Sequence, residues 1–397
     1  MADEPEQPPA HRLSRRQLLG IAGAAGGAAV IGAGGYVALR GDDEAAAGAQ
    51  PAEPFYGTHQ SGITSESPKY LHFASFDVSA GDRAGLQRLL RDLTSAAAEA
   101  TSGASPGIDD PARLTVTFGL GPSLFDARYG LAMQRPSPLA DIPAFKSDRL
   151  DPAISNGDVA VQFCSDDKAV TLHAAAAIAA AARGAARIRW SQEGFIRDKL
   201  RGDTSPNRRN LFGFLDGSNN LHGSDAAKMR TNVWADEASP AWMQNGTYMV
   251  TRKIVMQMAE FLTESVDLQQ DTFGRNKGTG APLGEQKEND PVDPSMVLPD
   301  CHIMMANQRR SYSQKERILR RSYNYTDGYD AQLSNPEGGL FFIAFQQDPR
   351  RQFIRIQGRM SHGDRLTKYI VHRSSAIWAV PPGAGRGGYV GETLFSA

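Results

Sequence analysis

The stretch YLHFASFDVSAGDRAGLQRLLRDLTSAAAEA, residues 70–100, joins a strand pattern directly to a helix pattern. Residues 70–78 gather apolar and aromatic side chains in a short run, which is typical of a buried strand. Residues 81–100 carry four leucines at helical spacing, so that these leucines form one apolar face. The stretch therefore predicts a strand followed by a helix.

The same alternation continues further along the chain. Strand patterns recur at 113–120, 157–165 and 187–194, and an alanine-rich helix pattern occupies 167–186. The order strand–helix–strand–strand–helix–strand is that of a ferredoxin-like α+β unit, in which helices cover one face of an antiparallel sheet. We therefore expect residues 67–210 to form an N-terminal ferredoxin-like domain.

A second series of elements follows, with a long interruption. Residues 246–265 run from a strand pattern into a helix pattern, 338–347 form a buried-strand pattern, and 369–383 end in another strand. The polar stretch 266–337 lies between them, and a connection of that length inside a domain is usually functional. We expect residues 211–397 to form a second ferredoxin-like domain, in an α+β fold of the dimeric α+β barrel type.

Composition narrows the class of protein. The chain has 397 residues, enough for two domains, and its 41% hydrophobic and 22% charged residues describe an ordinary globular protein. The formal net charge of −1 gives no indication of a nucleic-acid-binding surface, so we expect no nucleic-acid partner. Two cysteines, Cys164 and Cys301, exclude a disulfide framework but leave one disulfide between them open.

The N-terminal residues resemble an export signal. Arg15 and Arg16 precede a weakly hydrophobic run, residues 18–39, in which 14 of 22 residues are Gly or Ala. This pattern predicts a twin-arginine signal peptide over 1–49 and a linker over 50–66, with an uncleaved membrane anchor as the alternative. The twin-arginine pathway carries folded proteins, so export by this route is a first indication of a cofactor.

One short glycine motif and one histidine are candidates for chemistry. Gly213-Phe214-Leu215-Asp216-Gly217 is either a tight turn or a loop that pushes a carboxylate into a cavity. His302 lies in the long polar stretch, and a lone imidazole suits the single axial ligand of a five-coordinate haem iron. No HExxH, CxxC, GxSxG, Walker A or Rossmann motif occurs.

Four segments together resemble the dye-decolourising peroxidase family. They are GFLDG at 213–217, HIMMANQRR at 302–310, RILRRSYNY at 317–325 and DRLTKYIVHRSSAIWAVPPG at 364–383. The resemblance spans about residue 66 to the C-terminus. It implies a haem peroxidase built from two ferredoxin-like halves, with haem b bound in the C-terminal half.

The resemblance also implies roles for individual residues. His302 would be the proximal axial ligand of the haem iron, and Asp216 and Arg320 would form the distal catalytic pair. Gly213 and Gly217 would shape the loop that presents Asp216.

Further residues are expected around the cofactor. Arg309 is assigned to cofactor contacts, and Asp364 is the candidate carboxylate behind the proximal histidine, with Asp348 as its competitor. Phe214 and Leu215 would help to keep the distal face dry. The chain departs from the family pattern at Met304 and Gln308 and in the DGSNNL sequence, residues 216–221.

The resulting expectation is an exported haem b peroxidase that uses hydrogen peroxide to oxidise dyes, phenols or other small-molecule electron donors. It would be periplasmic, attached to the cell envelope or extracellular, with the twin-arginine translocase as a partner during export. A homo-oligomer and partners in iron uptake are further expectations. The alternatives are a haem-binding or iron-release protein with little turnover, a relative of the chlorite dismutases, and a cofactor-free α+β protein.

Overall fold

The computed structural model describes residues 53–330 and 335–396. The expected signal peptide lies outside these residues, so its structure and cleavage are not described. The part of the expected linker that is described packs against the N-terminal half: Phe55 and Ile63 are buried, and the Gln60 side chain exchanges two hydrogen bonds with the backbone of Phe118. None of the helices among the described residues is long and apolar enough to cross a membrane.

The N-terminal half has the order of elements that the sequence predicts. Its elements are β1 (Tyr70–Val78), α1 (Arg83–Thr101), β2 (Thr115–Leu120), β3 (Val159–Ser165), α2 (Lys168–Ala181) and β4 (Ala186–Phe195). The strands lie in the order β2-β3-β1-β4, and every neighbouring pair is antiparallel. Asp82 and Asp167 cap the two helices with their side chains.

The C-terminal half repeats this order of strands. Its sheet is built from β7 (Thr247–Met256), β9 (Tyr323–Asp330), β10 (Asn335–Gln346) and β12 (Ala376–Val380), in the order β12-β7-β10-β9. The first, second, third and fourth strands of each half therefore take equivalent places, which confirms the two ferredoxin-like halves. Strand β9 lies inside the polar stretch that the sequence analysis expected to be an irregular connection.

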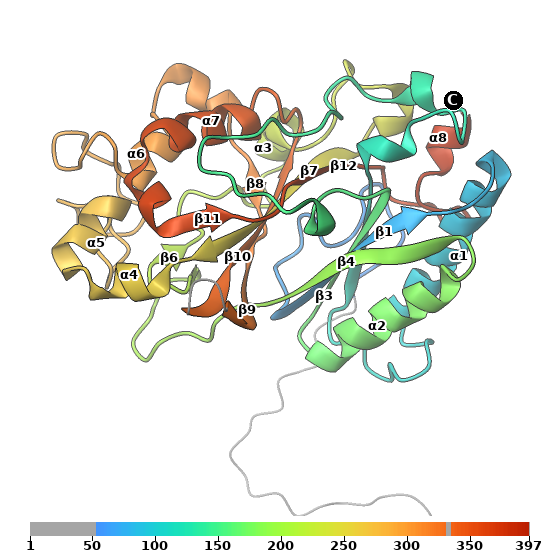
Figure 1. Cartoon of the computed structure of the whole chain (residues 1–397), viewed down its shortest axis with the longest axis horizontal. Coiled ribbons are helices and arrows are strands. Elements are labelled where there is room, and N and C mark those ends of the chain that lie inside the picture. The colour runs from blue at the N-terminus through green and yellow to red at the C-terminus, as the bar shows by residue number, and fades with distance from the viewer. Residues whose placement is uncertain (1–52, 331–334, 397) are drawn as a thin grey trace, which may run out of the picture. The chain divides into compact units, whose positions relative to one another are not determined.

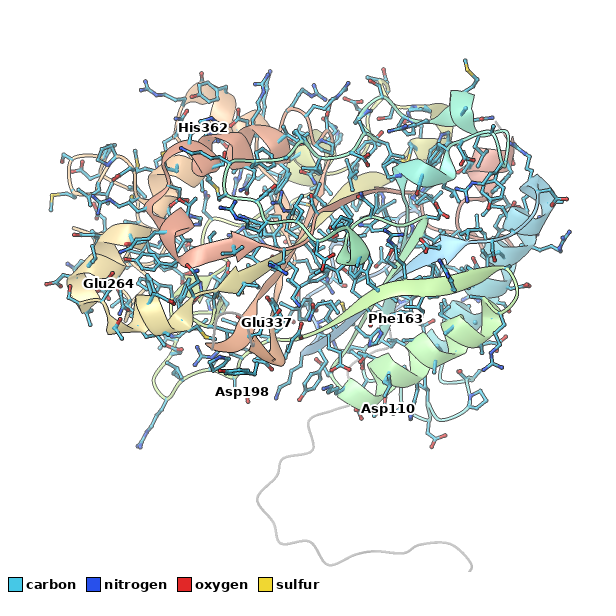
Figure 2. All side chains as sticks on the ribbon, viewed as in Figure 1. Asp110, Phe163, Asp198, Glu264, Glu337 and His362 are labelled. Carbon is cyan, nitrogen blue, oxygen red and sulfur yellow. The ribbon has the colours of Figure 1, made fainter. Side chains whose placement is uncertain are left out.

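The two sheets join at both edges. Ala379 of β12 pairs with Leu120 of β2, and Phe195 of β4 pairs with Asn324 of β9. Aromatic side chains from both sheets meet between them: Phe73 lies 5.2 Å from Phe341, measured between ring centroids. Figure 2 shows how side chains fill the molecule, from the fully buried Phe163 to the exposed Asp198.

The helices that cover the two sheets lie at opposite ends of the molecule (Figure 1). Helices α1 and α2 cover the N-terminal sheet, whereas α4 (Met258–Thr263), α5 (Val266–Phe273), α6 (His302–Ala306) and α7 (Phe353–Gly363) gather over the C-terminal half. Two short strands, β8 (Leu319–Arg320) and β11 (Ile370–His372), extend the C-terminal sheet along β10 and β7. The remaining helices are α3 (Ala226–Asn232) and the terminal α8 (Glu392–Ser396).

Candidate active site

The glycine motif forms a loop that presents Asp216 to a cavity. Strand β6 (Leu215–Asp216) pairs with β5 (Arg208–Arg209), and the chain on either side adopts positive φ angles, 90° at Gly213 and 132° at Gly217. A Cβ atom at Gly217 would lie 2.3 Å from Oδ1 of Asn207, so glycine is required there for space as well as for conformation. The motif is therefore both a tight turn and a loop that places a carboxylate on a cavity wall.

Arg320 is fixed beside Asp216 by the residues that follow the loop. Its backbone N–H donates to Asn220 Oδ1 at 2.9 Å, and its carbonyl accepts from Asn220 Nδ2 at 2.8 Å. Its Nη1 donates to Asp216 Oδ1 at 2.9 Å, and its Nη2 donates to the Ser218 carbonyl at 3.2 Å. Loop and strand thus hold the guanidinium and the carboxylate as one ion pair, with about a quarter of each side chain exposed.

His302 begins helix α6 and is oriented by a buried carboxylate. Its Nδ1 lies 2.7 Å from Oδ2 of Asp364, a side chain that is 1% exposed. Oδ1 of Asp364 accepts from the Leu366 N–H at 2.8 Å, which fixes the carboxylate in turn. Because a carboxylate only accepts, Nδ1 carries the proton and the opposite nitrogen, Nε2, keeps its lone pair.

Of the two carboxylates that the sequence offered, Asp364 is the one that contacts His302. Asp348 forms ion pairs with Arg350 at 2.8 Å and Arg351 at 3.2 Å.

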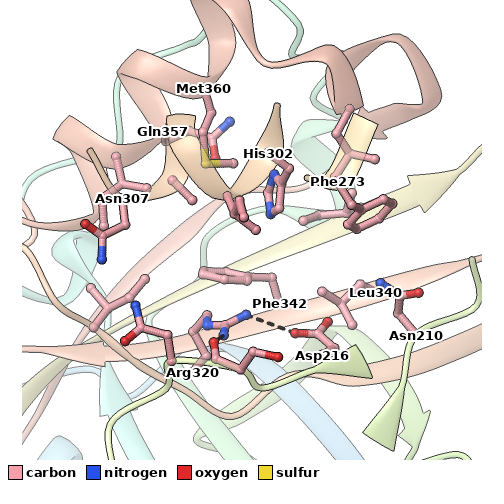
Figure 3. Close-up of a pocket in the computed structure, with 18 of the residues that line it drawn as sticks. Asn210, Asp216, Phe273, His302, Asn307, Arg320, Leu340, Phe342, Gln357 and Met360 are labelled. Atoms are coloured by element: carbon pink, nitrogen blue, oxygen red, sulfur yellow. Dashed lines mark hydrogen bonds and ion pairs between the residues drawn. The ribbon is translucent and has the colours of Figure 1, made fainter. Parts of the chain in front are cut away.

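The imidazole and the ion pair face each other across one cavity. Figure 3 shows His302 on one side and Asp216 with Arg320 on the other. Helices α6 and α7 supply one wall, and β7 and β10 supply the facing wall. The apolar lining residues are Phe212, Leu215, Ile254, Met256, Phe273, Ile303, Ala306, Ile318, Leu340, Phe342, Phe353, Ile356, Met360, Leu366 and Ile370.

The expected role of Phe214 is wrong in detail, whereas Leu215 lines the cavity as expected. Phe214 is not among the lining residues; its ring stacks on Phe273 with centroids 4.0 Å apart and an interplanar angle of 11°. Phe273 does line the cavity and meets the His302 ring edge to face at 5.8 Å. Phe214 thus supports the proximal side indirectly, through its neighbour.

Positive charge is in excess around the cavity. Arg275, Arg309 and Arg317 line it, and none of the three forms an ion pair within the described residues. Burial lowers the pKa of Arg275 to about 10 and also lowers the pKa of Arg309 and of Arg317. Burying even part of a cation without a carboxylate partner is costly, so the cavity suits an anionic ligand.

Arg309, expected to contact a cofactor, also closes the end of helix α6. Its backbone has a φ of 54°, and its Nη1 donates to the carbonyls of Ile303 at 2.8 Å and Asn307 at 2.6 Å. Both cysteines are free and buried, so the disulfide that the sequence left open does not form. The described residues contain no cluster of three or more His, Cys, Asp or Glu side chains that could hold a bare metal ion.

The arrangement defines a haem site of the peroxidase class. One carboxylate-backed imidazole suits a single axial position on iron, the apolar walls suit a flat macrocycle, and the unpaired arginines suit its carboxylates. The residues present therefore fit haem.

Comparison with known proteins identifies the family. The family models for the N-terminal and C-terminal parts of Dyp-type peroxidases match residues 60–196 and 207–385. The chain belongs to the Dyp-type peroxidase family, whose members are haem-dependent peroxidases with haem b as cofactor.

Relatives cover nearly the whole of the described chain. A deferrochelatase of Escherichia coli K12 is 34% identical over 359 residues, 83% of this chain and 84% of that protein. The structure of DtpA from Streptomyces lividans in an oxyferrous/water mixed complex superimposes with a TM-score of 0.81 at 37% identity, over 87% of this chain and 98% of that one. A DyP-type peroxidase of Streptomyces coelicolor gives a TM-score of 0.81 at 36% identity, over 88% and 98%.

Proposed function

We propose that this chain is an exported haem b peroxidase that uses hydrogen peroxide to oxidise dyes, phenols or other one-electron donors. The observation that carries the proposal is the opposition of His302, backed by Asp364, and the Asp216–Arg320 pair across one cavity. When bound, haem would supply the redox chemistry that passes the two oxidising equivalents of hydrogen peroxide on to electron donors.

His302 and Asp364 would hold the cofactor from the proximal side. The carboxylate keeps the proton on Nδ1 and orients the ring, so that Nε2 is free to bind iron. Arg309 and Arg275 would face the carboxylates of the cofactor, because both line the cavity and neither has an acidic partner among the described residues; Arg275 is buried and Arg309 half-buried.

Asp216 would move the proton that peroxide cleavage requires. Asp216 lines the cavity; its Oδ1 is occupied by Arg320, whereas its Oδ2 has no hydrogen-bond partner among the described residues. Oδ2 can take a proton from one oxygen of hydrogen peroxide and deliver it to the other oxygen, which then leaves as water.

Arg320 would stabilise the negative charge that develops as the oxygens separate. A guanidinium has five N–H donors, and Arg320 uses one on Asp216 and one on Ser218. The remaining donors can face the peroxide, and the fixed ion pair means that no large reorganisation is needed during the reaction.

Rapid mixing tests these roles. Haem-loaded wild-type protein, Asp216→Asn and Arg320→Leu would each be mixed with hydrogen peroxide, and the Soret band followed. Loss of a proton-transfer group typically costs 10²–10⁴-fold, so we expect the second-order rate constant to fall by about that factor in Asp216→Asn. Equal rate constants in all three proteins would contradict the proposal.

A second candidate function is removal of iron from haem. The observation that favours it is the identity of about 34% with several proteins named deferrochelatase. Incubating haem-loaded protein with an iron chelator and a reductant, then measuring metal-free porphyrin fluorescence, separates the two functions. Formation of metal-free porphyrin, without peroxide-dependent oxidation of an electron donor, would favour iron removal as the function.

Export by the twin-arginine pathway forms part of the proposal and rests on the sequence. The supporting feature is Arg15-Arg16 ahead of the weakly apolar run at 18–39. Fusing residues 1–60 to a reporter that is active only after translocation tests it, with Arg15→Lys/Arg16→Lys as the matched variant. Export that does not depend on the arginine pair would refute this part alone. The expected homo-oligomer and iron-uptake partners stay predictions.

A further inference from the structure

Glu288 gathers three hydrogen-bond donors from two other segments of the chain. It lies in the connection between α5 and α6. Its Oε1 accepts from Asn207 Nδ2 at 2.6 Å and from Ser218 Oγ at 2.6 Å, and its Oε2 accepts from Ser205 Oγ at 2.5 Å. Each of these short hydrogen bonds restrains a side chain at an entropic cost. Three such bonds to one carboxylate are therefore more than a surface residue without a structural role would form.

Two of these donors belong to the immediate surroundings of the distal pair. Ser218 follows Gly217 directly, and its carbonyl accepts from Arg320 Nη2. Asn207 packs so closely on Gly217 that a Cβ there would clash with its Oδ1. Glu288 therefore fixes two side chains: that of Ser218, which follows Gly217, and that of Asn207, against which Gly217 packs.

The backbone of Glu288 is itself held by a cavity residue. Arg275 Nη1 donates to the Glu288 carbonyl at 2.9 Å and to the Gly280 carbonyl at 2.6 Å. Arg275 is 8% exposed and lines the cavity. A contiguous set of contacts thus runs from one side of the cavity through Glu288 to the loop that carries Asp216.

We propose that Glu288 is a positioning residue for the distal pair, acting through Ser218 and Asn207 on the loop between Gly213 and Asn220. The inference rests on the proposed function, since it matters for catalysis only if Asp216 and Arg320 act on peroxide. Glu288 does not line the cavity, so it works without touching substrate or cofactor. Its carboxylate is suited to the task because two oxygens can accept all three hydrogen bonds at once.

The test uses Glu288→Ala, with Glu285→Gln as the matched control in the same connection. The Glu285 side chain forms no hydrogen bond or ion pair within the described residues. The first readout needs no haem: hydrogen exchange of the peptide covering 207–221, followed by mass spectrometry. We expect exchange there to be at least tenfold faster in Glu288→Ala and unchanged in Glu285→Gln.

The second readout separates positioning from general loss of structure. In haem-loaded protein we expect the rate constant with peroxide to fall about tenfold, because small displacements of catalytic groups cost one to two orders of magnitude. The haem dissociation constant and the KM for an electron donor should change less than twofold. Two results for Glu288→Ala would overturn the inference. One is a fall in haem affinity as large as the fall in the rate constant with peroxide, and the other is unchanged hydrogen exchange of the 207–221 peptide.

Ser218 provides a milder pair of variants if Glu288→Ala does not fold. Ser218→Ala removes one of the three hydrogen bonds, whereas Ser218→Thr keeps the hydroxyl, so the rate should fall further in Ser218→Ala than in Ser218→Thr. Equal rates in the two would contradict the inference. Failure of the proposed function can be distinguished from failure of this inference. If the proposed function is wrong, Arg320→Leu will have the same rate constant with peroxide as the wild type, while hydrogen exchange still reports on the role of Glu288.

Discussion

Replacing Asp364 with asparagine tests the proximal side of the site most directly. The substitution keeps the size of the side chain and one oxygen for the Leu366 N–H, so the cap of the following turn survives. It places an amide N–H₂ against His302 Nδ1 at the 2.7 Å contact. The imidazole must then accept at Nδ1 and carry its proton on Nε2, the nitrogen needed for iron.

The magnitude follows from the hydrogen bond that is lost. A hydrogen bond to a charged group contributes about 1.5–3 kcal/mol. Loss of the carboxylate behind a metal-bound histidine typically weakens metal binding about 10–100-fold, or about 1.4–2.7 kcal/mol. The two estimates agree, so we expect haem affinity to fall about 10–100-fold in Asp364→Asn.

Titration of haem-free protein with haem, followed at the Soret band, measures this change. Asp348→Asn is the matched control: that carboxylate is also buried and ion-paired, but with Arg350 and Arg351. We expect the control to lose stability without losing haem affinity. Haem affinity of Asp364→Asn within threefold of the wild type would refute the assignment of His302 as an oriented ligand.

Three further perturbations probe the fold around the site. Gly217→Ala forces a side chain onto a backbone with a φ of 132° and against Asn207. Chemical denaturation should therefore show that the free energy of unfolding falls by about 2–4 kcal/mol, compared with about 1–2 kcal/mol for Gly213→Ala. Phe214→Ala removes a buried, stacked ring and should cost about 3–5 kcal/mol by the same measurement. Burial and a nearby arginine lower the pKa of His372 to about 3, so its neutral form stabilises the folded state above about pH 6.5 and that stability is lost as the pH falls towards 3. Unfolding curves at several pH values should therefore fall more steeply for the wild type than for His372→Gln, by up to about 1.4 kcal/mol per pH unit; parallel curves would contradict this.

The regular elements of the N-terminal half could be predicted because their patterns are local. Strand β9 could not, although Tyr323 and Tyr325 alternate inward with period two. The polar and glycine residues after them resemble a loop, and only pairing with β4 and β10 makes them a strand. Helix α7 was not predicted, although its apolar residues recur at helical spacing; Gly358 and the polar residues around it lower its helix propensity.

The site was predictable in its parts but not in its contacts. Asp216 and Arg320 are 104 residues apart, and no spacing rule relates them; only the family resemblance paired them. The family resemblance favoured Asp364 over Asp348 as the carboxylate behind His302, but no local pattern in the sequence separates the two. Arg275 and Arg317 carry no local signal at all, because an arginine in a polar connection is usually solvated.

The repeated fold explains why only one half carries the site. In the N-terminal half, α1 and α2 place apolar side chains such as Leu89 and Ile178 directly on the sheet, and one continuous core results. In the C-terminal half, the connection from β7 to β9 contains α5, α6 and β8, and the cavity opens between α7 and the face of β10. The same strand order thus supports a filled core in one half and a ligand cavity in the other. The candidate residues His302 and Arg320 come from the inserted connection and Asp216 from the loop before it, whereas Asp364 follows α7; the sheet fixes their relative positions.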